Sequence, residues 1–195
     1  MTSDFSFDER LAFSKGRRLA SPEKTITAML DGCVSVRTAT MTEERVGVDY
    51  IATLRGGAQV LIDEKRRDRG CGQHWRHGQP EVALEIWSVV PTGQSRGIAG
   101  WTCSESKATD LVLFTFDPID TANCYLLPFQ HLRMAFRRKY AEWRQLFRAP
   151  YQSTDGRYQS RCLFVPIDLV MAAIDEVSRL EEDAPPAGSK LPGFD

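Results

Sequence analysis

The chain lacks the features that mark several large classes of protein. None of its apolar runs approaches the roughly 18–20 residues that are needed to span a bilayer. The N-terminal residues 1–9 have neither the basic start nor the apolar stretch of a secretory signal. A formal net charge of −1 argues against a polybasic scaffold but leaves local basic patches open. We therefore expect a cytoplasmic protein that does not cross a membrane.

Nucleotide-binding motifs are also missing, and histidine is scarce. The sequence has neither a P-loop nor a GxGxxG motif, so we expect no nucleotide cofactor. The five cysteines are odd in number and scattered, which indicates reduced thiols. Cys71, His74 and His77 lie close together and are candidate zinc ligands, with Cys103 as a conceivable fourth. No second Cys or His pair accompanies them, so a flexible loop is the alternative interpretation.

The composition is that of one globular domain. The 195 residues are 42% hydrophobic and 26% charged, which are ordinary values for a soluble fold. We expect an N-terminal arm over residues 1–20 and a single domain over 21–180. A disordered tail is predicted over 181–195, because this stretch is rich in proline, glycine and charge. The sequence contains no internal repeat.

Hydrophobic periodicity and turn signals predict an α/β fold with a mixed central β-sheet flanked by helices. Ser21 followed by Pro22 predicts a helix start. The segment 110–116 is nearly continuously apolar, which indicates an interior strand of the sheet. The remaining predicted strands are 46–54, 59–65, 82–90, 124–127 and an extended segment at 161–166, and the remaining helices run from Pro128 to about 147 and over 167–180.

Charged residues on two of these strands form the candidate site. Side chains alternate faces along a strand, so Asp63 and Lys65 point one way and Glu64 the other. Asp49 lies on the preceding strand. Two carboxylates and an ammonium on one face are suited to holding a hard divalent cation and to activating water. The alternative is a solvated strand edge, because residues 63–68 form a run of charge.

This arrangement resembles the PD-(D/E)xK, or restriction-endonuclease-like, nuclease superfamily over roughly residues 21–127. The resemblance implies a restriction-endonuclease-like core in which Asp49 and Asp63 bind Mg²⁺ or Mn²⁺. It also implies that Lys65 orients the attacking water or stabilises charge on the phosphate. Many members add an acidic residue on the first helix, and Glu23 is the matching position here.

The chain departs from the superfamily pattern at two positions. Val48 precedes the first aspartate in place of the proline of the motif, which many members also lack, and Glu64 stands where an apolar residue is usual. The stretch 97–101, followed by Lys107 and Asp110, is similar to a segment of nuclease-like proteins from phages and mobile elements.

The hairpin between the two strands provides a geometric test. A two-residue loop at Gly56 and Gly57 would pair Asp49 with Glu64 and place Asp49 away from Asp63. A three-residue loop would pair Asp49 with Lys65, on the same face as Asp63. The nuclease hypothesis therefore requires an odd loop, or a bulge near Asp49.

Basic side chains are the candidate substrate contacts. Arg66 and Arg67 follow the putative site directly, and Lys107 lies in the long excursion 91–107. The helix from Pro128 carries Arg133 and Arg137 on a stripe that is suited to a phosphate backbone. A solvated helix face is the alternative. The neighbouring aromatic stripe is expected to be core; it consists of Leu132, Phe136, Tyr140, Trp143 and Phe147.

Three hypotheses about function follow. The first is a metal-dependent nuclease that hydrolyses DNA phosphodiester bonds. The second keeps the fold without catalysis, as a module that binds nucleic acid or protein. The third is an unrelated α/β interaction protein, which would be indicated if Asp63 and Lys65 lay far from Asp49. An oligomer is compatible with each of them.

Overall fold

The computed structural model describes residues 21–67, 75–76, 79–92, 96–116, 123–149, 151–154 and 158–182. The predicted arm over 1–20 lies outside these residues, as does the predicted tail apart from its first two residues. The zinc candidates Cys71, His74 and His77 also lie outside them.

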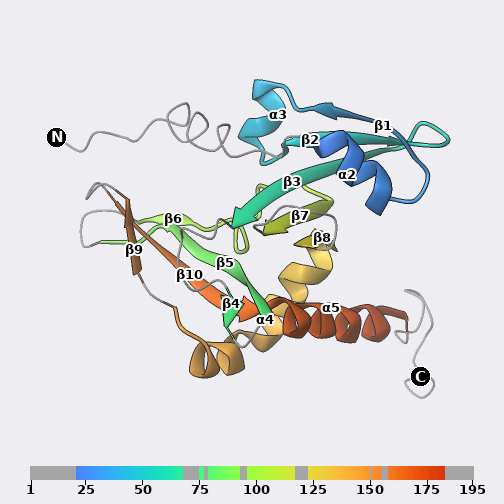
Figure 1. Cartoon of the computed structure of the whole chain (residues 1–195). Helices are drawn as coiled ribbons and strands as arrows, with labels where there is room; N and C mark the ends of the chain where they lie inside the picture. The colour runs from blue at the N-terminus through green and yellow to red at the C-terminus, as the bar shows by residue number, and fades with distance from the viewer. Residues whose placement is uncertain are drawn as a thin grey trace, which may run out of the picture.

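The first sheet is mixed and contains five strands in the order β1-β2-β3-β7-β8. Strands β1, β2 and β3 form an antiparallel meander, β7 runs parallel to β3, and β8 returns antiparallel to β7 (Figure 1). The apolar run predicted to be interior is β7, and it is paired on both sides. The bounds are β1 Cys33–Thr38, β2 Tyr50–Leu54, β3 Gln59–Arg67, β7 Leu111–Phe116 and β8 Cys124–Pro128.

A second sheet was not predicted. The sequence indicated one central sheet, but the strand expected at 82–90 pairs antiparallel with a strand near the C-terminus. Periodicity identifies a strand without identifying its partner, and this partner is distant in sequence. The second sheet has the order β4-β5-β10-β9, with β6 paired to β5; the bounds are β4 Trp75–Arg76, β5 Gln79–Val89, β6 Ile98–Ala99, β9 Tyr151–Thr154 and β10 Tyr158–Pro166.

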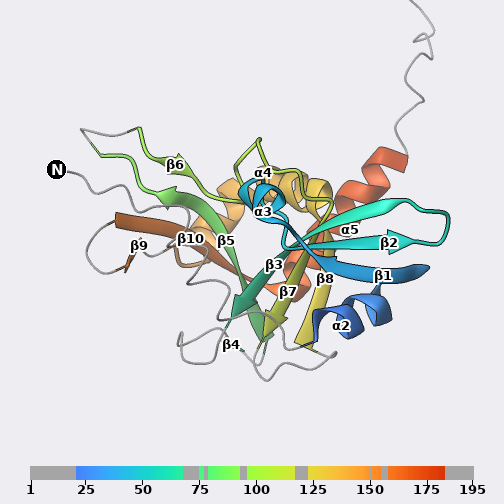
Figure 2. The ribbon, with the colours of Figure 1, turned by 90° about the horizontal axis from the view of Figure 1, so that it is seen from above.

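Four helices occur in the described parts of the chain. They are α2 (Pro22–Met29), α3 (Met41–Arg45), α4 (Phe129–Leu146) and α5 (Ile167–Glu182). Three of them were predicted, whereas the short α3 was not. It is held by a capping box, in which Thr40 and Glu43 each satisfy the other's backbone N–H. Helices α4 and α5 pack against each other. In Figure 1 these two helices and the second sheet lie below the first sheet. Figure 2, viewed from above, shows the two sheets crossing at an angle.

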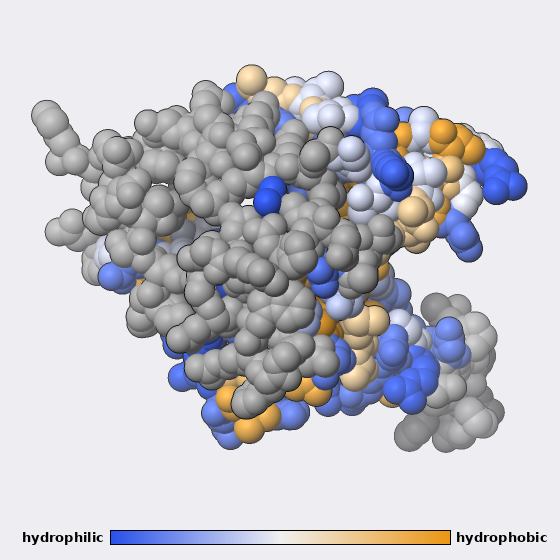
Figure 3. All heavy atoms as spheres, viewed as in Figure 1, coloured by the Kyte–Doolittle hydropathy of each residue, from blue (hydrophilic) through white to orange (hydrophobic). Residues whose placement is uncertain are grey.

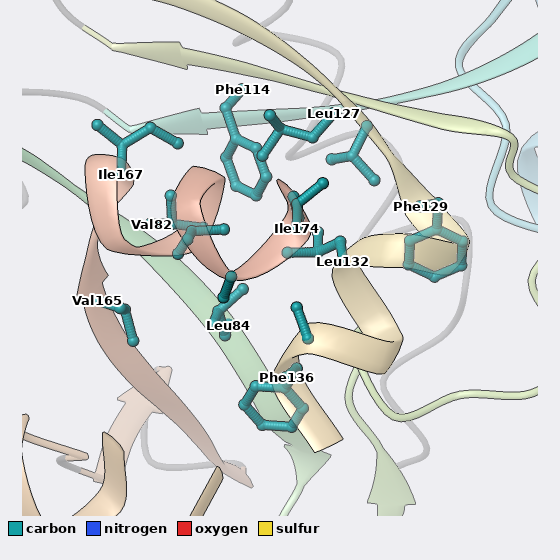
Figure 4. Close-up of a cluster of buried hydrophobic side chains, with 14 of the residues drawn as sticks. Val82, Leu84, Phe114, Leu127, Phe129, Leu132, Phe136, Val165, Ile167 and Ile174 are labelled. Atoms are coloured by element: carbon teal, nitrogen blue, oxygen red, sulfur yellow. The ribbon is translucent and has the colours of Figure 1, made fainter. Parts of the chain in front are cut away.

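The largest hydrophobic core joins the two sheets. It brings together Leu84 of β5, Phe114 of β7, Phe136 of α4 and Ile174 of α5 (Figure 4). The aromatic stripe of α4 lies in or against this core, as predicted. A smaller cluster fills the opposite face of the first sheet, where Ile26 of α2 packs with residues of β2, β3 and β7. The first sheet is therefore covered on both faces, and the face that carries Asp63 is directed toward the second sheet.

The described surface has no single character on the face seen in Figure 3, where hydrophilic and hydrophobic residues intermingle. Among the helices that the structure describes, none is both long enough and apolar enough to cross a membrane.

Candidate functional site

The β2–β3 hairpin places Asp49 beside Asp63. Leu54 N–H donates to the Ala58 carbonyl, so the loop contains the three residues 55–57, and the prediction of an odd loop is confirmed. The exact pairing was wrong: Tyr50 lies opposite Ile62, where the predicted three-residue loop would have placed it opposite Glu64. The register differs because the loop begins one residue earlier than the glycine pair suggested.

Two hydrogen bonds hold Asp49 in place. Its backbone N–H donates to the Ile62 carbonyl at 2.8 Å. Its side-chain Oδ2 accepts from the Glu64 N–H, also at 2.8 Å. Since these partners are the residues immediately before and after Asp63, the Asp49 carboxyl is fixed next to the Asp63 carboxyl.

Asp63 lies between two ammonium groups. Lys65 Nζ is 2.6 Å from Asp63 Oδ1, and Lys107 Nζ is 2.5 Å from Asp63 Oδ2. The Asp63 side chain is 3% exposed, against 27% for Lys65 and 15% for Lys107. Each oxygen of this buried carboxylate therefore has its own cationic partner, which is the arrangement that makes burial of a charge tolerable.

The pKa values follow from burial and mutual charge. Burial alone would raise the pKa of Asp63, but Lys65 and Lys107 lower it to about 2. Burial, followed by the negative charge of Asp63, raises the pKa of Asp49. Burial also opposes the charged form of Lys65, yet the two carboxylates raise its pKa. Burial and the neighbouring charge of Lys65 lower the pKa of Lys107. The cluster thus contains one firmly ionised carboxylate beside one whose charge is disfavoured.

Lys107 reaches Asp63 by passing over Gly47. Gly47 has a φ of +87°, and a Cβ atom placed on it would lie 2.7 Å from Lys107 Nζ. The segment around Lys107 is tied to the same turn, because Ala108 N–H donates to the Val46 carbonyl and the Thr109 hydroxyl donates to the Gly47 carbonyl at 2.7 Å. The sequence predicted Lys107 as a phosphate contact; in the structure it contacts the carboxylate.

Two other acidic residues, Glu64 and Glu23, lie away from this cluster. Glu64 Oε2 accepts from the Tyr50 hydroxyl at 2.7 Å, on the face covered by α2. Glu23 is exposed on α2 itself. The structure therefore brings Asp49, Asp63 and Lys65 together but does not bring Glu23 to them.

A tryptophan and a glutamate border the cluster on the side of the second sheet. Lys65 Nζ lies 5.7 Å from the centre of the Trp101 ring, within cation–π range. The backbone N–H of Trp101 donates to Glu85 Oε2 at 3.1 Å, which connects the excursion to β5. Trp101 is buried in the core, where it anchors the excursion. Its contact with Lys65 was not predicted, because the two residues belong to distant segments.

The predicted substrate-binding arginines are dispersed. The Arg67 guanidinium stacks on the Phe164 ring at 4.6 Å, between the two sheets. Arg133 is buried against Phe129, with its guanidinium 5.6 Å from that ring. Arg137 pairs with Glu105 at 3.1 Å on the surface. The remaining candidate, Arg66, is partly buried next to Arg67 on β3. Of the five predicted contacts, Lys107 forms an ion pair with Asp63.

The acidic pair offers oxygen ligands of the kind that Mg²⁺ or Mn²⁺ prefers. No group of three or more His, Cys, Asp or Glu side chains that could hold an ion occurs among the described residues. Mg²⁺, however, is commonly held by one or two carboxylates together with water and substrate phosphates. Asp49 and Asp63 therefore fit this cation as a minimal ligand set. Comparison with protein-family models, with curated proteins and with solved structures found no significant match.

Proposed function

We propose that the protein is a metal-dependent nuclease that hydrolyses DNA phosphodiester bonds, with Asp49 and Asp63 as ligands of Mg²⁺ or Mn²⁺. The observation that carries the proposal is the convergence of Asp49, Asp63 and Lys65 on one face of β3. Their convergence is specified by the odd hairpin loop and by the two hydrogen bonds of Asp49. The two carboxylates repel each other, and the pKa of Asp49 is raised. A divalent cation bound between them would reduce this repulsion.

The arrangement of the first sheet supports the same proposal. A helix, an antiparallel meander and a strand parallel to β3 follow each other along the chain, and Asp49 and Asp63 lie at the β2–β3 pair of this meander. The connection from β3 to β7 runs through β5 of the second sheet, whereas the sequence indicated one central sheet. We infer a restriction-endonuclease-like core with an added sheet.

Each residue of the site has its own role in the proposed reaction. Asp49 and Asp63 would hold the cation, which would polarise the scissile phosphate and lower the pKa of a bound water. Lys65, whose Nζ is 2.6 Å from Asp63 Oδ1, would supply an ammonium beside the cation for the attacking water or the phosphate oxygen. The Trp101 ring centre lies 5.7 Å from Lys65 Nζ, and this cation–π contact helps to hold the ammonium in place.

Cleavage of plasmid DNA with Mg²⁺ or Mn²⁺ tests this proposal. We expect Asp63→Asn and Lys65→Met each to lower the cleavage rate by at least about a hundredfold, the usual scale for a group that stabilises a transition state. The matched controls are Asp31→Asn and Lys24→Met, which make the same changes at exposed positions. Undiminished cleavage in the Asp63 and Lys65 variants would refute the assignment.

The second candidate function is a nuclease-fold module that binds nucleic acid or protein without cleaving. One observation favours it: both oxygens of Asp63 are already engaged by lysines. Under this alternative the wild-type protein would bind DNA in a gel-shift assay and leave it intact with either cation. Wild-type cleavage that depends on Asp63 would exclude the module.

A further inference from the structure

The position of Lys107 has a consequence for metal binding that Lys65 does not share. Lys65 is on β3, two residues from Asp63 and on the same face of the strand, and it contacts Oδ1. Lys107 comes from the excursion between the sheets and occupies Oδ2 through a long flexible side chain. A cation that binds both Asp49 and Asp63 needs an oxygen of Asp63. Each of the two Asp63 oxygens, however, already has an ammonium partner.

We propose that Lys107 is a placeholder for the metal: it occupies Asp63 Oδ2 in the metal-free protein and must leave this oxygen when a divalent cation binds. The inference rests on the proposed function, because it takes Asp49 and Asp63 to be the metal ligands. It assigns Lys107 a positioning role that differs from the phosphate contact predicted from the sequence.

Charge compensation supports this role. Without a metal and without Lys107, two buried carboxylates would face one ammonium, and Asp63 is too deeply buried to be compensated by water. Lys107 supplies the second positive charge and makes the empty site tolerable. A divalent cation brings two charges to the same place, so Lys107 and the cation are in competition for one oxygen.

The chain also provides the path along which Lys107 reaches the site. The Cε and Nζ atoms of Lys107 pass over Gly47, within 2.9 and 2.7 Å of where a Cβ would stand. The Thr109 hydroxyl holds the Gly47 carbonyl, so the turn and the excursion are fixed to each other while the lysine end remains the adjustable part. An alanine at position 47 would therefore displace the ammonium while keeping its charge in the protein.

Direct Mn²⁺ binding, measured by titration calorimetry at one pH, tests the inference. We expect Lys107→Met to bind Mn²⁺ at least about tenfold more tightly than the wild type, because the competitor is gone. Lys24→Met makes the same change of charge at an exposed position and should leave the affinity unchanged. Gly47→Ala should also bind more tightly, although it retains the lysine.

Gly57→Ala is the matched control for Gly47→Ala. Gly57 has a φ of +89°, so alanine is strained there to the same degree, but nothing lies within 4 Å of its Cβ position. We expect no change in Mn²⁺ affinity in this variant. If Lys107→Met does not fold, a Mn²⁺-soaked wild-type crystal decides instead, since Lys107 Nζ should then be more than 4.0 Å from both Asp63 oxygens.

The outcomes separate this inference from the proposed function. Mn²⁺ binding that is abolished by Asp63→Asn but unchanged or weakened in Lys107→Met and Gly47→Ala would overturn the placeholder and leave the nuclease proposal standing. A Mn²⁺-soaked crystal with the metal bound and Lys107 still on Asp63 would do the same. Absence of any Asp63-dependent Mn²⁺ binding in the wild type and in both variants would overturn both.

Discussion

At the scale of single residues, the site combines one stabilised carboxylate with one that is destabilised. Alternation along β3 was sufficient to predict that Asp63 and Lys65 share a face and that Glu64 does not. The partner on Asp63 Oδ2 was beyond prediction, because Lys107 arrives from a segment 44 residues away. Lys107 passes over Gly47, two residues before Asp49, but a lone glycine in a sequence does not indicate which side chain will lie beside it.

The raised pKa of Asp49 predicts that this residue lowers the stability of the protein. Asp49→Asn keeps an oxygen that can accept from the Glu64 N–H but removes the charge next to Asp63. We expect a gain of about 1 kcal/mol in the free energy of unfolding at pH 7 without metal, together with loss of cleavage. Thermal unfolding in EDTA measures the gain, and Asp31→Asn should show none.

The same comparison has a defined pH dependence. A carboxyl whose pKa is raised in the folded state lowers the stability of the fold once it is ionised, at pH values above that raised pKa. This cost is absent below the ordinary pKa of 3.8, where the group is protonated in both the folded and the unfolded state. The advantage of Asp49→Asn should therefore be small below pH 3.8 and grow as the pH rises through the elevated pKa. An advantage that is constant from pH 3.5 to 7 would show that charge repulsion is not its cause.

At the scale of elements, what the sequence made predictable depended on burial. The buried strand β7, the partly buried strand β3 and the helix α4 were predicted closely in position. Strand β1 was missed because most of its residues are exposed, so that it has no apolar alternation. The pairing of β5 with β10 was missed because it depends on contacts between distant segments rather than on local pattern.

The contact between the excursion and β5 predicts a strong effect of Gly100→Ala. A Cβ on Gly100 would overlap the Glu85 carbonyl oxygen, which is backbone and cannot move aside. We expect a loss of about 1–3 kcal/mol in the free energy of unfolding and a more exposed Trp101. Urea unfolding and tryptophan fluorescence measure the two effects.

Gly32→Ala is a useful comparison for that variant. Gly32 has a φ of +73° but open space around its Cβ position, so only backbone strain should act there. Equal destabilisation of the two variants, with unchanged fluorescence in both, would contradict a steric contact at Gly100.

At the scale of the whole molecule, the two sheets share one hydrophobic core. Residues of β5, β7, α4 and α5 pack in one hydrophobic cluster, and Arg67 of β3 stacks on Phe164 of β10. The candidate site lies on the first sheet. It also includes contacts from Trp101 and Lys107, which belong to the excursion that follows β5 of the second sheet. The prediction of a single domain over 21–180 remains to be tested by experiment.

Cooperative unfolding provides that test. We expect urea unfolding followed by far-ultraviolet circular dichroism and by tryptophan fluorescence to give one coincident transition. Leu84→Ala, in β5, should shift both curves together by about 2–5 kcal/mol. Separate transitions, or a shift in one signal alone, would indicate two independent domains.

The route of the chain from β3 to β7 also sets the order in which the charged cluster is assembled. The local meander of β1, β2 and β3 already carries Asp49, Asp63 and Lys65, whereas the parallel pairing with β7 must wait until the intervening excursion closes a long loop. A nascent chain that has reached only the meander thus bears the acidic pair with a single ammonium. Completion of the fold is what neutralises it.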